Sequence, residues 1–354
     1  MTAVTQAPVQ RTSPMARLGR WGRALSRELT TVVITMFGLL LVTFFIARVV
    51  PIDPVLAVVG DRAPADVYEK ARLALGLDKP LWQQFAIYVG KVFTGDLGTS
   101  VLTSQKVTDD IRTVFPATLE LATLGTLIGV VIGVPLGIVA AVNQGRWQDQ
   151  IARVIGLIGY SVPVFWIGLM ALLLFYAKLG WVSGPGRISV VWQDIVTTRT
   201  GIILIDAALE GEWEAFWDAF SHLILPAAVL GLLSVAYISR MTRSFMIGEL
   251  QQQYVIAARV KGVSEWAVIW RHALRNAAVP LFTVIALSYM HLLEGSVLTE
   301  TIFAWPGLGR YLTNALLNAD MNAVLGGTLV VGVVFIAVNL LTDIIGRLAD
   351  PRVR

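Results

Sequence analysis

Six long apolar stretches restrict what this chain can fold into. Each is close to or above the roughly 20 residues that a helix needs to cross the hydrocarbon core of a bilayer. Only 15% of the residues are charged, against about 25% in ordinary soluble domains. Because backbone groups in lipid must be hydrogen-bonded within the chain, the stretches predict transmembrane helices of an all-α integral membrane protein. The six predicted spans are 29–50, 116–142, 154–177, 222–239, 278–298 and 323–342.

The placement of lysine and arginine predicts the orientation, since these residues are enriched in cytoplasmic loops. With the N-terminus inside, the cytoplasmic segments carry a summed charge of +10 and the outer segments −6. Both termini are therefore predicted to be cytoplasmic. The cytoplasmic segments are 1–28, 143–153, 240–276 and 343–354, and the outer segments are 51–115, 179–221 and 299–322.

The expected organisation is a membrane core with an extension at each end. Its parts are a basic cytoplasmic tail (1–28), the first span (29–50), a periplasmic segment (51–115), a core with spans two to six (116–345) that includes the loop 240–276, and a C-terminal cytoplasmic tail (346–354). The apolar stripe among arginines within residues 15–27 fits either a short interfacial helix or a positive topology signal. The periplasmic segment is too long for a plain connection. It contains two helical patterns, 66–77 and 80–93.

Small residues and prolines inside the spans predict how the helices pack and bend. A four-residue spacing of glycines in the second span gives one smooth face for close helix packing. Pro135 and Pro163 remove backbone donors inside the second and third spans, so kinks are expected there. The glycines of the smooth face are Gly125, Gly129, Gly133 and Gly137.

The loop 240–276 is long and basic, and it is also patterned. A helical pattern ends at Gly262, a residue type that tolerates the left-handed backbone of a helix stop. A second helix is predicted over 265–274. The loop therefore predicts a helix–glycine–helix elbow that exposes Val263 and Trp266 outside the membrane. Exposed apolar side chains on such an elbow require a protein partner.

This elbow resembles the "EAA" loop of ABC importer permeases, in which Glu-Ala-Ala is followed by three residues, Gly, nine residues and Ile-x-Leu-Pro. The matching positions are Ala257, Ala258, Gly262, Ala273 and Leu274, and the departures are Ile256, His272 and Arg275. The runs 257–262 and 271–276 resemble the version of this loop in the dipeptide, oligopeptide and nickel importer class.

Other runs are similar to the "B" permease of that class, and together the resemblance covers roughly residues 29–354. These runs are 75–78 and 95–98 in the first outer segment, 163–168 in the third span, 300–309 in the last outer loop, and 339–343 with 350–354 at the C-terminus.

The resemblance implies a six-helix, type I (MetI-like) ABC importer permease fold in a bacterial cytoplasmic (inner) membrane. It also implies three kinds of protein partner: a second, homologous permease that forms a heterodimer with this chain, two cytoplasmic ATPase subunits, and an extracytoplasmic substrate-binding protein. No nucleic acid partner is expected. The chain itself would bind no cofactor, because ATP and Mg would be used by the ATPase subunits.

The resemblance implies that the elbow couples the ATPase to the membrane helices. Gly262 would set the elbow angle, Ala257 and Ala258 would allow close approach, and Val263 and Trp266 would fill a groove of the ATPase. Arg259 and Lys261 would either pair with acidic residues at the groove rim or only enforce topology. Glu265, at the start of the second helix, completes the predicted coupling surface.

Glu120, His291 and Glu294 are the candidates for a translocation path or gate. Charge inside a membrane is costly and usually faces a partner or water, so a carboxylate here would face the path of a cationic amino group. The alternative is structural: an ion pair or snorkelling for the glutamates, and packing or capping for His291. The sequence favours this structural alternative.

The remaining chemistry classes are disfavoured by what the sequence lacks. It has no cysteine, which excludes disulfides and thiolate sites, and its three histidines predict no shared metal site. No phosphate-binding loop or catalytic motif is present, so no catalytic residue is predicted. A di- or oligopeptide permease is the favoured function. The alternatives are the same architecture importing nickel or another small solute, and an ion-coupled secondary transporter.

Overall fold

The computed structural model describes residues 30–46, 54–60, 62–74 and 76–349. The chain divides into two compact units, Met1–Val50 and Pro51–Arg354. In the first unit, the described residues form one apolar helix, Thr30–Ile46. Every regular element in the described part of the second unit is a helix, which confirms the expected all-α fold.

The second unit contains its helices in the following order. They are α2 (Pro54–Val59), α3 (Ala65–Ala74), α4 (Leu81–Phe93), α5 (Val107–Val142), α6 (Trp147–Ser161), α7 (Val164–Ala171), a π-helical stretch η1 (Leu172–Lys178), α8 (Val190–Gln193), α9 (Ile203–Glu210), α10 (Trp213–Leu250), α11 (Gln253–Val260), α12 (Glu265–Ala267), a second π-helical stretch η2 (Val268–Ala273), α13 (Leu274–Ile302), α14 (Leu308–Leu317) and α15 (Met321–Ala349).

All six predicted spans overlap apolar helices in the described part of the chain. Four helices are long and apolar enough to cross a membrane singly: Val107–Val142, Trp213–Leu250, Glu265–Ile302 and Met321–Thr342. The pair α6 and α7–η1 passes the same test as one bent span, and Thr30–Ile46 is a shorter apolar helix. The predicted six-helix membrane protein is consistent with this arrangement.

The third predicted span differs from expectation because it is broken rather than kinked. Trp147–Ser161 and Val164–Lys178 meet at an angle of 99°. Val162 between them is extended, with φ −90° and ψ 126°. A residue before proline is pushed out of the helical region, and proline has no N–H to continue the ladder, so Pro163 explains the break. By contrast, α5 continues through Pro135 without interruption.

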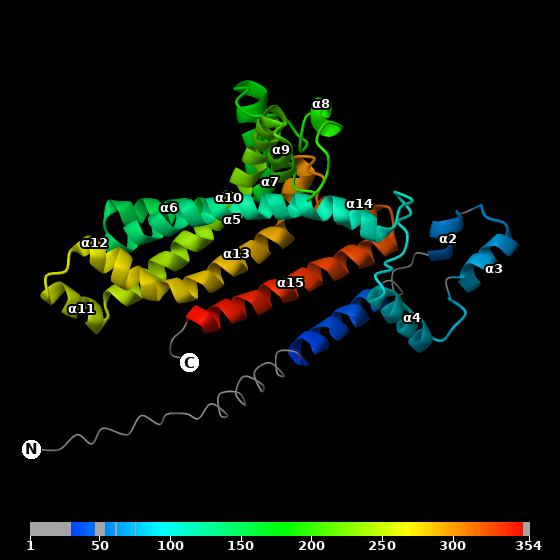
Figure 1. Ribbon diagram of the computed structural model, residues 1–354, viewed down its shortest axis with the longest axis horizontal. Coiled ribbons are helices and arrows are strands. Elements are labelled where there is room, and N and C mark those ends of the chain that lie inside the picture. The colour runs from blue at the N-terminus through cyan, green and yellow to red at the C-terminus, as the bar shows by residue number, and fades with distance from the viewer. Residues whose placement is uncertain (1–29, 47–53, 61, 75, 350–354) are drawn as a thin grey trace, which may run out of the picture. The chain divides into compact units, whose positions relative to one another are not determined.

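Helix α10 is the centre of the second unit. It packs against α5, α6 and α13, and Figure 1 shows α5 and α13 running alongside it. Of the most apolar 18-residue stretch of α10, 67% is buried, against 17% for that of α15. The cluster that joins α10 to α5 and α13 includes Leu121, Leu223, Leu230, Leu292 and Trp305. The sparsely buried faces of the other helices are left for lipid or for another subunit.

The glycine face of the second span packs against α10, as predicted. A Cβ added to Gly129 would lie 2.5 Å from Cβ of Ser234. A Cβ added to Gly137 would lie 2.5 Å from the Ser239 carbonyl oxygen and 2.6 Å from Cβ of Thr242. These distances are too short for any side chain, so glycine is what allows the two backbones to approach.

We expect Gly137→Ala to destabilise the packing of α5 against α10, because the Ser239 carbonyl oxygen cannot yield without moving α10. Overpacking of this kind costs about 1–3 kcal/mol. The thermal midpoint of the detergent-solubilised protein should therefore fall by several degrees. Gly156→Ala in α6 is the matched control, since its nearest atom, the Ala236 oxygen, is 4.0 Å away. Equal midpoints for Gly137→Ala and the wild type would contradict this account.

The segment before α5 contains both predicted helices, α3 and α4, with boundaries close to those expected. The end of this segment is fixed to the start of α15 through Asp320, which is fully buried. Its carboxylate accepts a hydrogen bond of 2.6 Å from the Ser100 hydroxyl and one of 3.2 Å from the Ala323 N–H in the first turn of α15. The segment is thereby part of the second unit's packed structure.

Two predictions concern the chain ends. The interfacial helix considered within residues 15–27 lies outside the described residues, as do residues 350–354. Helix α15 continues to Ala349, so the predicted C-terminal tail begins as a continuation of the last helix.

Candidate coupling elbow and buried polar networks

The loop between α10 and α13 forms the predicted elbow. Helix α10 ends at Leu250 and α11 follows after a short turn. Gly262 comes next with φ +78°, the left-handed conformation expected of it. Helix α12 starts after Ser264, whose hydroxyl accepts a hydrogen bond of 3.4 Å from the Ala267 N–H. Figure 1 shows α11 and α12 together at the end of α10 away from α8 and α9.

The two arms of the elbow enclose a small apolar core. Val255 and Val268 are 0% exposed and Ala258 is 9% exposed. Leu250 and Val263 pack against these three residues. The predicted exposure of Val263 is therefore wrong: Val263 is half-buried, and both it and Ala258 pack between the two arms of the elbow.

Several apolar side chains on the surface of the elbow are not covered by other described residues. Val260 is 83% exposed, Trp266 is 70% exposed and Ile256 is 45% exposed, and Ala257 lies among the exposed positions of α11. The exposure predicted for Trp266 is confirmed. Val260 is not among the predicted coupling residues. The sequence pattern of a short helix does not distinguish the face that packs against α12 from the face exposed to solvent.

Arg259 pairs with a residue of the elbow. Its Nε donates to Oε1 of Glu265 at 2.8 Å and its Nη2 donates to Oε2 at 3.2 Å, which links the two arms across Gly262. The two side chains are 41% and 62% exposed, and exposed ion pairs of this kind are weak. The pair therefore remains open to competition from charges on a partner. Lys261 is exposed beside it.

A second polar site lies where α6 meets α10 and was not among the candidates. The Asp149 side chain is 0% exposed. Arg243 on α10 donates from Nε to Oδ1 at 2.6 Å and from Nη2 to Oδ2 at 2.9 Å. Arg153, one turn along α6, donates to Oδ2 at 2.8 Å, and the Gly145 N–H donates to the same oxygen at 2.9 Å. We call these four residues the Asp149 cluster.

The Asp149 carboxylate is held ionised by these donors. The hydrogen bond from Arg243 is the largest cause of a pKa well below the ordinary value, burial opposes it, and Arg153 and Gly145 add to the lowering. The spacing of Asp149 and Arg153 is visible in the sequence as an i, i+4 pair. The partner from α10 is not, because it lies 94 positions away.

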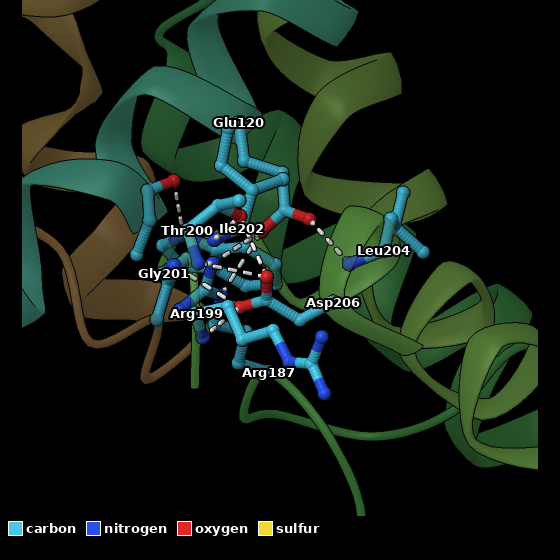
Figure 2. A network of polar contacts seen from close by, with 10 residues as sticks. Glu120, Arg187, Arg199, Thr200, Gly201, Ile202, Leu204 and Asp206 are labelled. Carbon is cyan, nitrogen blue, oxygen red and sulfur yellow. Dashed lines mark hydrogen bonds and ion pairs between the residues drawn. The ribbon is translucent and has the colours of Figure 1, made fainter. Parts of the chain in front are cut away.

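Glu120 is part of a buried network at the other end of the helices (Figure 2). Arg187 donates from Nη2 to Oε2 of Glu120 at 2.6 Å and to the Gly201 carbonyl oxygen at 2.7 Å. The Leu204 N–H, in the first turn of α9, donates to Oε1 of Glu120 at 3.3 Å. The two charged side chains are only 10% and 5% exposed. This is the structural ion-pair arrangement considered for Glu120, and it fixes the segment between η1 and α10 onto α5.

The same segment is shaped by a second carboxylate, Asp206, which is 1% exposed. It accepts backbone hydrogen bonds from Arg199, Thr200 and Gly201 at 3.2, 2.8 and 3.0 Å. Burial alone would raise the pKa of Asp206, but these hydrogen bonds, with Thr200 contributing most, outweigh it and lower the pKa. Asp206 thus fixes the loop that presents Gly201 to Arg187, as Figure 2 shows.

Glu300 explains the run 300–309 that contributed to the resemblance. Its side chain is fully buried and accepts hydrogen bonds from the Thr118 hydroxyl at 2.7 Å, the Ser296 hydroxyl at 2.8 Å and the Arg310 N–H at 2.8 Å. The last of these caps the start of α14. A Cβ on Gly307 would lie 2.5 Å from the Glu300 carboxylate oxygens, so glycine there leaves room for the carboxylate.

His291 and Glu294 lie on a different, uncovered face of α13. They are exposed together with Leu287 and Leu298, at a spacing that places all four on one stripe of the helix. His291 makes an edge-on ring contact with Tyr237, with centroids 6.4 Å apart. Glu294 forms no hydrogen bond or ion pair with any described residue.

Beside Glu294 lies an apolar pocket between α5, α13, α14 and α15. Its lining includes Phe115, Met290, Leu308 and Phe335. The structure therefore brings Glu294 and His291 together on one surface and places Glu120 elsewhere, in an ion pair. Among the described residues, no group of three or more His, Asp or Glu side chains is arranged to hold a metal.

Two protein families match successive parts of this chain. Residues 133–354 match the family described as "Binding-protein-dependent transport system inner membrane component". Residues 22–122 match the N-terminal part of such membrane components. A solved structure of the MetNI methionine ABC transporter in an inward-facing conformation is similar at a TM-score of 0.49 and 17% identity, covering 66% of this chain and 93% of that one.

Several curated relatives match almost from end to end. The probable D,D-dipeptide transport system permease protein DdpB of Escherichia coli is 42% identical over 91% of this chain and 94% of its own length. The di/tripeptide transport system permease protein DppB of Pseudomonas aeruginosa is 43% identical, covering 93% and 98%. The dipeptide transport system permease protein DppB of Escherichia coli is 43% identical, covering 93% and 97%.

Matches of this identity and coverage confirm the resemblance found in the sequence. The chain is an integral inner membrane protein that belongs to the family of binding-protein-dependent transport system inner membrane components.

Proposed function

We propose that this chain is one of two permease subunits of an ATP-driven ABC importer and forms part of the path by which di- and oligopeptides cross the cytoplasmic membrane. The observation that carries the proposal is identity above 40%, over more than nine-tenths of the chain, to permeases of di- and tripeptide systems. None of those three names nickel. The partners in this proposal are a homologous permease, two ATPase subunits and an extracytoplasmic binding protein, with both termini cytoplasmic.

The exposed elbow supports the coupling part of this proposal. Val260 and Trp266 present an apolar surface outside the predicted membrane spans, and such a patch is a protein contact site. Closure of the ATPase pair would move the elbow and, through it, α10 and α13. The switch between inward and outward exposure is then a rigid-body transition between two packed arrangements. In this proposal ATP is hydrolysed by the partner subunits and not by this chain.

Reconstitution tests the proposal directly. Vesicles with this chain, the second permease, both ATPases, the binding protein and ATP should accumulate labelled dipeptide. Uptake should stop when the phosphate-binding lysine of the ATPases is replaced. Accumulation by this chain alone on a proton or sodium gradient would overturn the proposal in favour of a secondary transporter.

Glu294 is the proposed acidic group of the translocation path. We expect Glu294→Gln to lower dipeptide uptake about tenfold, which corresponds to loss of an interaction of about 1.4 kcal/mol with the peptide ammonium. Uptake would be measured at saturating binding protein, with Glu294→Asp as the conservative comparison that keeps part of the activity. Wild-type uptake by Glu294→Gln would remove this residue from the path.

A further inference from the structure

The Asp149 cluster joins helices α6 and α10 through an ion pair between Asp149 and Arg243. No other ion pair among the described residues joins these two helices. The Asp149 carboxylate, at the start of α6, receives both nitrogen donors of Arg243 from α10 at 2.6 and 2.9 Å. Two parallel hydrogen bonds between a guanidinium and a carboxylate fix orientation as well as distance. Since Asp149 is 0% exposed and Arg243 is 22% exposed, water competes little for this contact.

Arg243 stands close to the elbow. It lies on the last turns of α10, which ends at Leu250 where the elbow begins. The next turn carries Met246, which is 0% exposed and packs with Ala273 of η2 and Ala277 of α13. The end of α10 is therefore packed against the exit of the elbow, and a displacement of the elbow reaches Arg243 through this contact.

Helix α6 leads from the cluster to a different part of the structure. It meets α7 at the 99° bend, and near that bend Tyr160 receives a hydrogen bond of 3.2 Å from Arg240 of α10. Beyond the bend, Gly168 of α7 faces Phe303, which follows α13 and is 2% exposed. Helices α6 and α7 thus connect the Asp149 cluster to Phe303, which lies close to the Glu300 network.

Arg153, the second arginine of the cluster, has a different structural role from Arg243. Arg153 is four residues from Asp149 on the same helix, so its contact cannot hold α6 to α10. Removing one partner of a buried ion pair normally leaves the other charge uncompensated. Here, when one arginine is replaced, the other still pairs with Asp149. This makes the two arginines a matched pair: one acts within a helix and the other between helices.

We propose that Asp149 and Arg243 are positioning residues that make α6 and α7 move with the elbow, so that the bent pair transmits the ATPase stroke to the region of Phe303 as a second route beside α10 and α13. This rests on the coupling role proposed for the elbow. Without the contact, α10 and α13 still follow the elbow while α6 and α7 lag behind. ATP is then hydrolysed without a completed change of access.

The first test compares Arg243→Gln with Arg153→Gln in the complete reconstituted complex. Arg243→Gln is expected to raise the ATP hydrolysed per dipeptide transported by about tenfold, within the usual range of coupling free energies between sites. Arg153→Gln is expected to leave that ratio unchanged. A merely structural role would lower the amount of assembled complex and leave the ratio of the assembled fraction unaltered. An unchanged ratio in Arg243→Gln, or an equal rise in Arg153→Gln, overturns the proposal.

A distance measurement keeps the proposal testable if Arg243→Gln assembles poorly. The chain has no cysteine, so cysteines introduced at Gln150 of α6 and Ser244 of α10, both exposed, would carry the only spin labels on this chain when it is assembled with cysteine-free partners. The distance between labels should stay constant between nucleotide-free and ATP-trapped complexes. With Arg243→Lys, which loses the paired geometry, it should change between these states. A constant distance in Arg243→Lys overturns the proposal.

Gly262→Asp, measured alongside, separates this proposal from the coupling role of the elbow. If Gly262→Asp abolishes uptake and Arg243→Gln leaves the ratio unchanged, only the Asp149–Arg243 route fails. If Gly262→Asp transports normally, the elbow role itself fails.

Discussion

Gly262→Asp is expected to abolish peptide uptake while the chain remains inserted in the membrane at wild-type amounts. Gly262 has φ +78°, a conformation that costs an ordinary residue roughly 1–2 kcal/mol. A Cβ there would have no atom within 4 Å, so nothing clashes and the fold survives. The change instead alters the angle between α11 and α12 and places a negative charge beside the Arg259–Glu265 pair, which weakens docking of the ATPase.

Uptake, membrane content and co-purified ATPase would be measured for each variant. Gly95→Asp is the matched control, because Gly95 has φ +77° and also open space around its Cβ position, yet it lies in the segment before α5. It carries the same backbone cost and the same added charge, and it should retain uptake and bound ATPase. Normal uptake by Gly262→Asp, or an equal defect in Gly95→Asp, would contradict the coupling role proposed for the elbow.

Glu300→Ala is expected to prevent recovery of folded protein after detergent extraction. The change leaves the Arg310 N–H and the Thr118 hydroxyl without their buried acceptor, at about 1–3 kcal/mol for each unsatisfied group. It also opens a void beside Gly307 and Gly309, whose missing side chains accommodate the carboxylate. The loss falls on the junction of α5, α13 and α14, where Glu300 bonds to Thr118 of α5 and Arg310 of α14.

Size-exclusion profiles and thermal midpoints of the detergent-extracted protein would measure this effect. Glu294→Ala is the control on the same helix, since that glutamate is exposed, and its profile should match the wild type. Glu300→Gln should recover part of the stability, because its amide keeps the shape and one acceptor. A wild-type midpoint for Glu300→Ala would show that the network contributes nothing to folding.

Much of the membrane architecture is predictable because lipid leaves few choices. A chain in hydrocarbon must satisfy its backbone groups internally, so each predicted apolar run overlaps an apolar helix in the described residues. Helices α3 and α4 were likewise found from their patterns. The break at Val162 is sharper than the expected kink, because Pro163 inside a helical pattern indicates disruption without giving its angle. Beyond the break, α7 packs against Phe303, which is distant in sequence and is not indicated by the local pattern.

The polar networks show where sequence reasoning ends. Glu120 was recognised as an intramembrane charge, but its partner Arg187 is 67 positions away. The Thr118 donor of Glu300 is 182 positions away. Such pairs are created by tertiary packing, and no local spacing indicates them. In the elbow, Gly262 and Trp266 behave as predicted, while the inward turn of Ala258 and Val263 depends on Val268 arriving from the second arm.

Helix α10 is unbroken over 38 residues, which makes it a continuous rod of about 57 Å at the standard helical rise. Pro226 lies inside it without interrupting it. No loop or turn separates its two ends. Under the proposed coupling role, a tilt produced at Leu250 would also move Trp213, so that substrate loading on one side of the membrane and energy input on the other would be timed by a single motion.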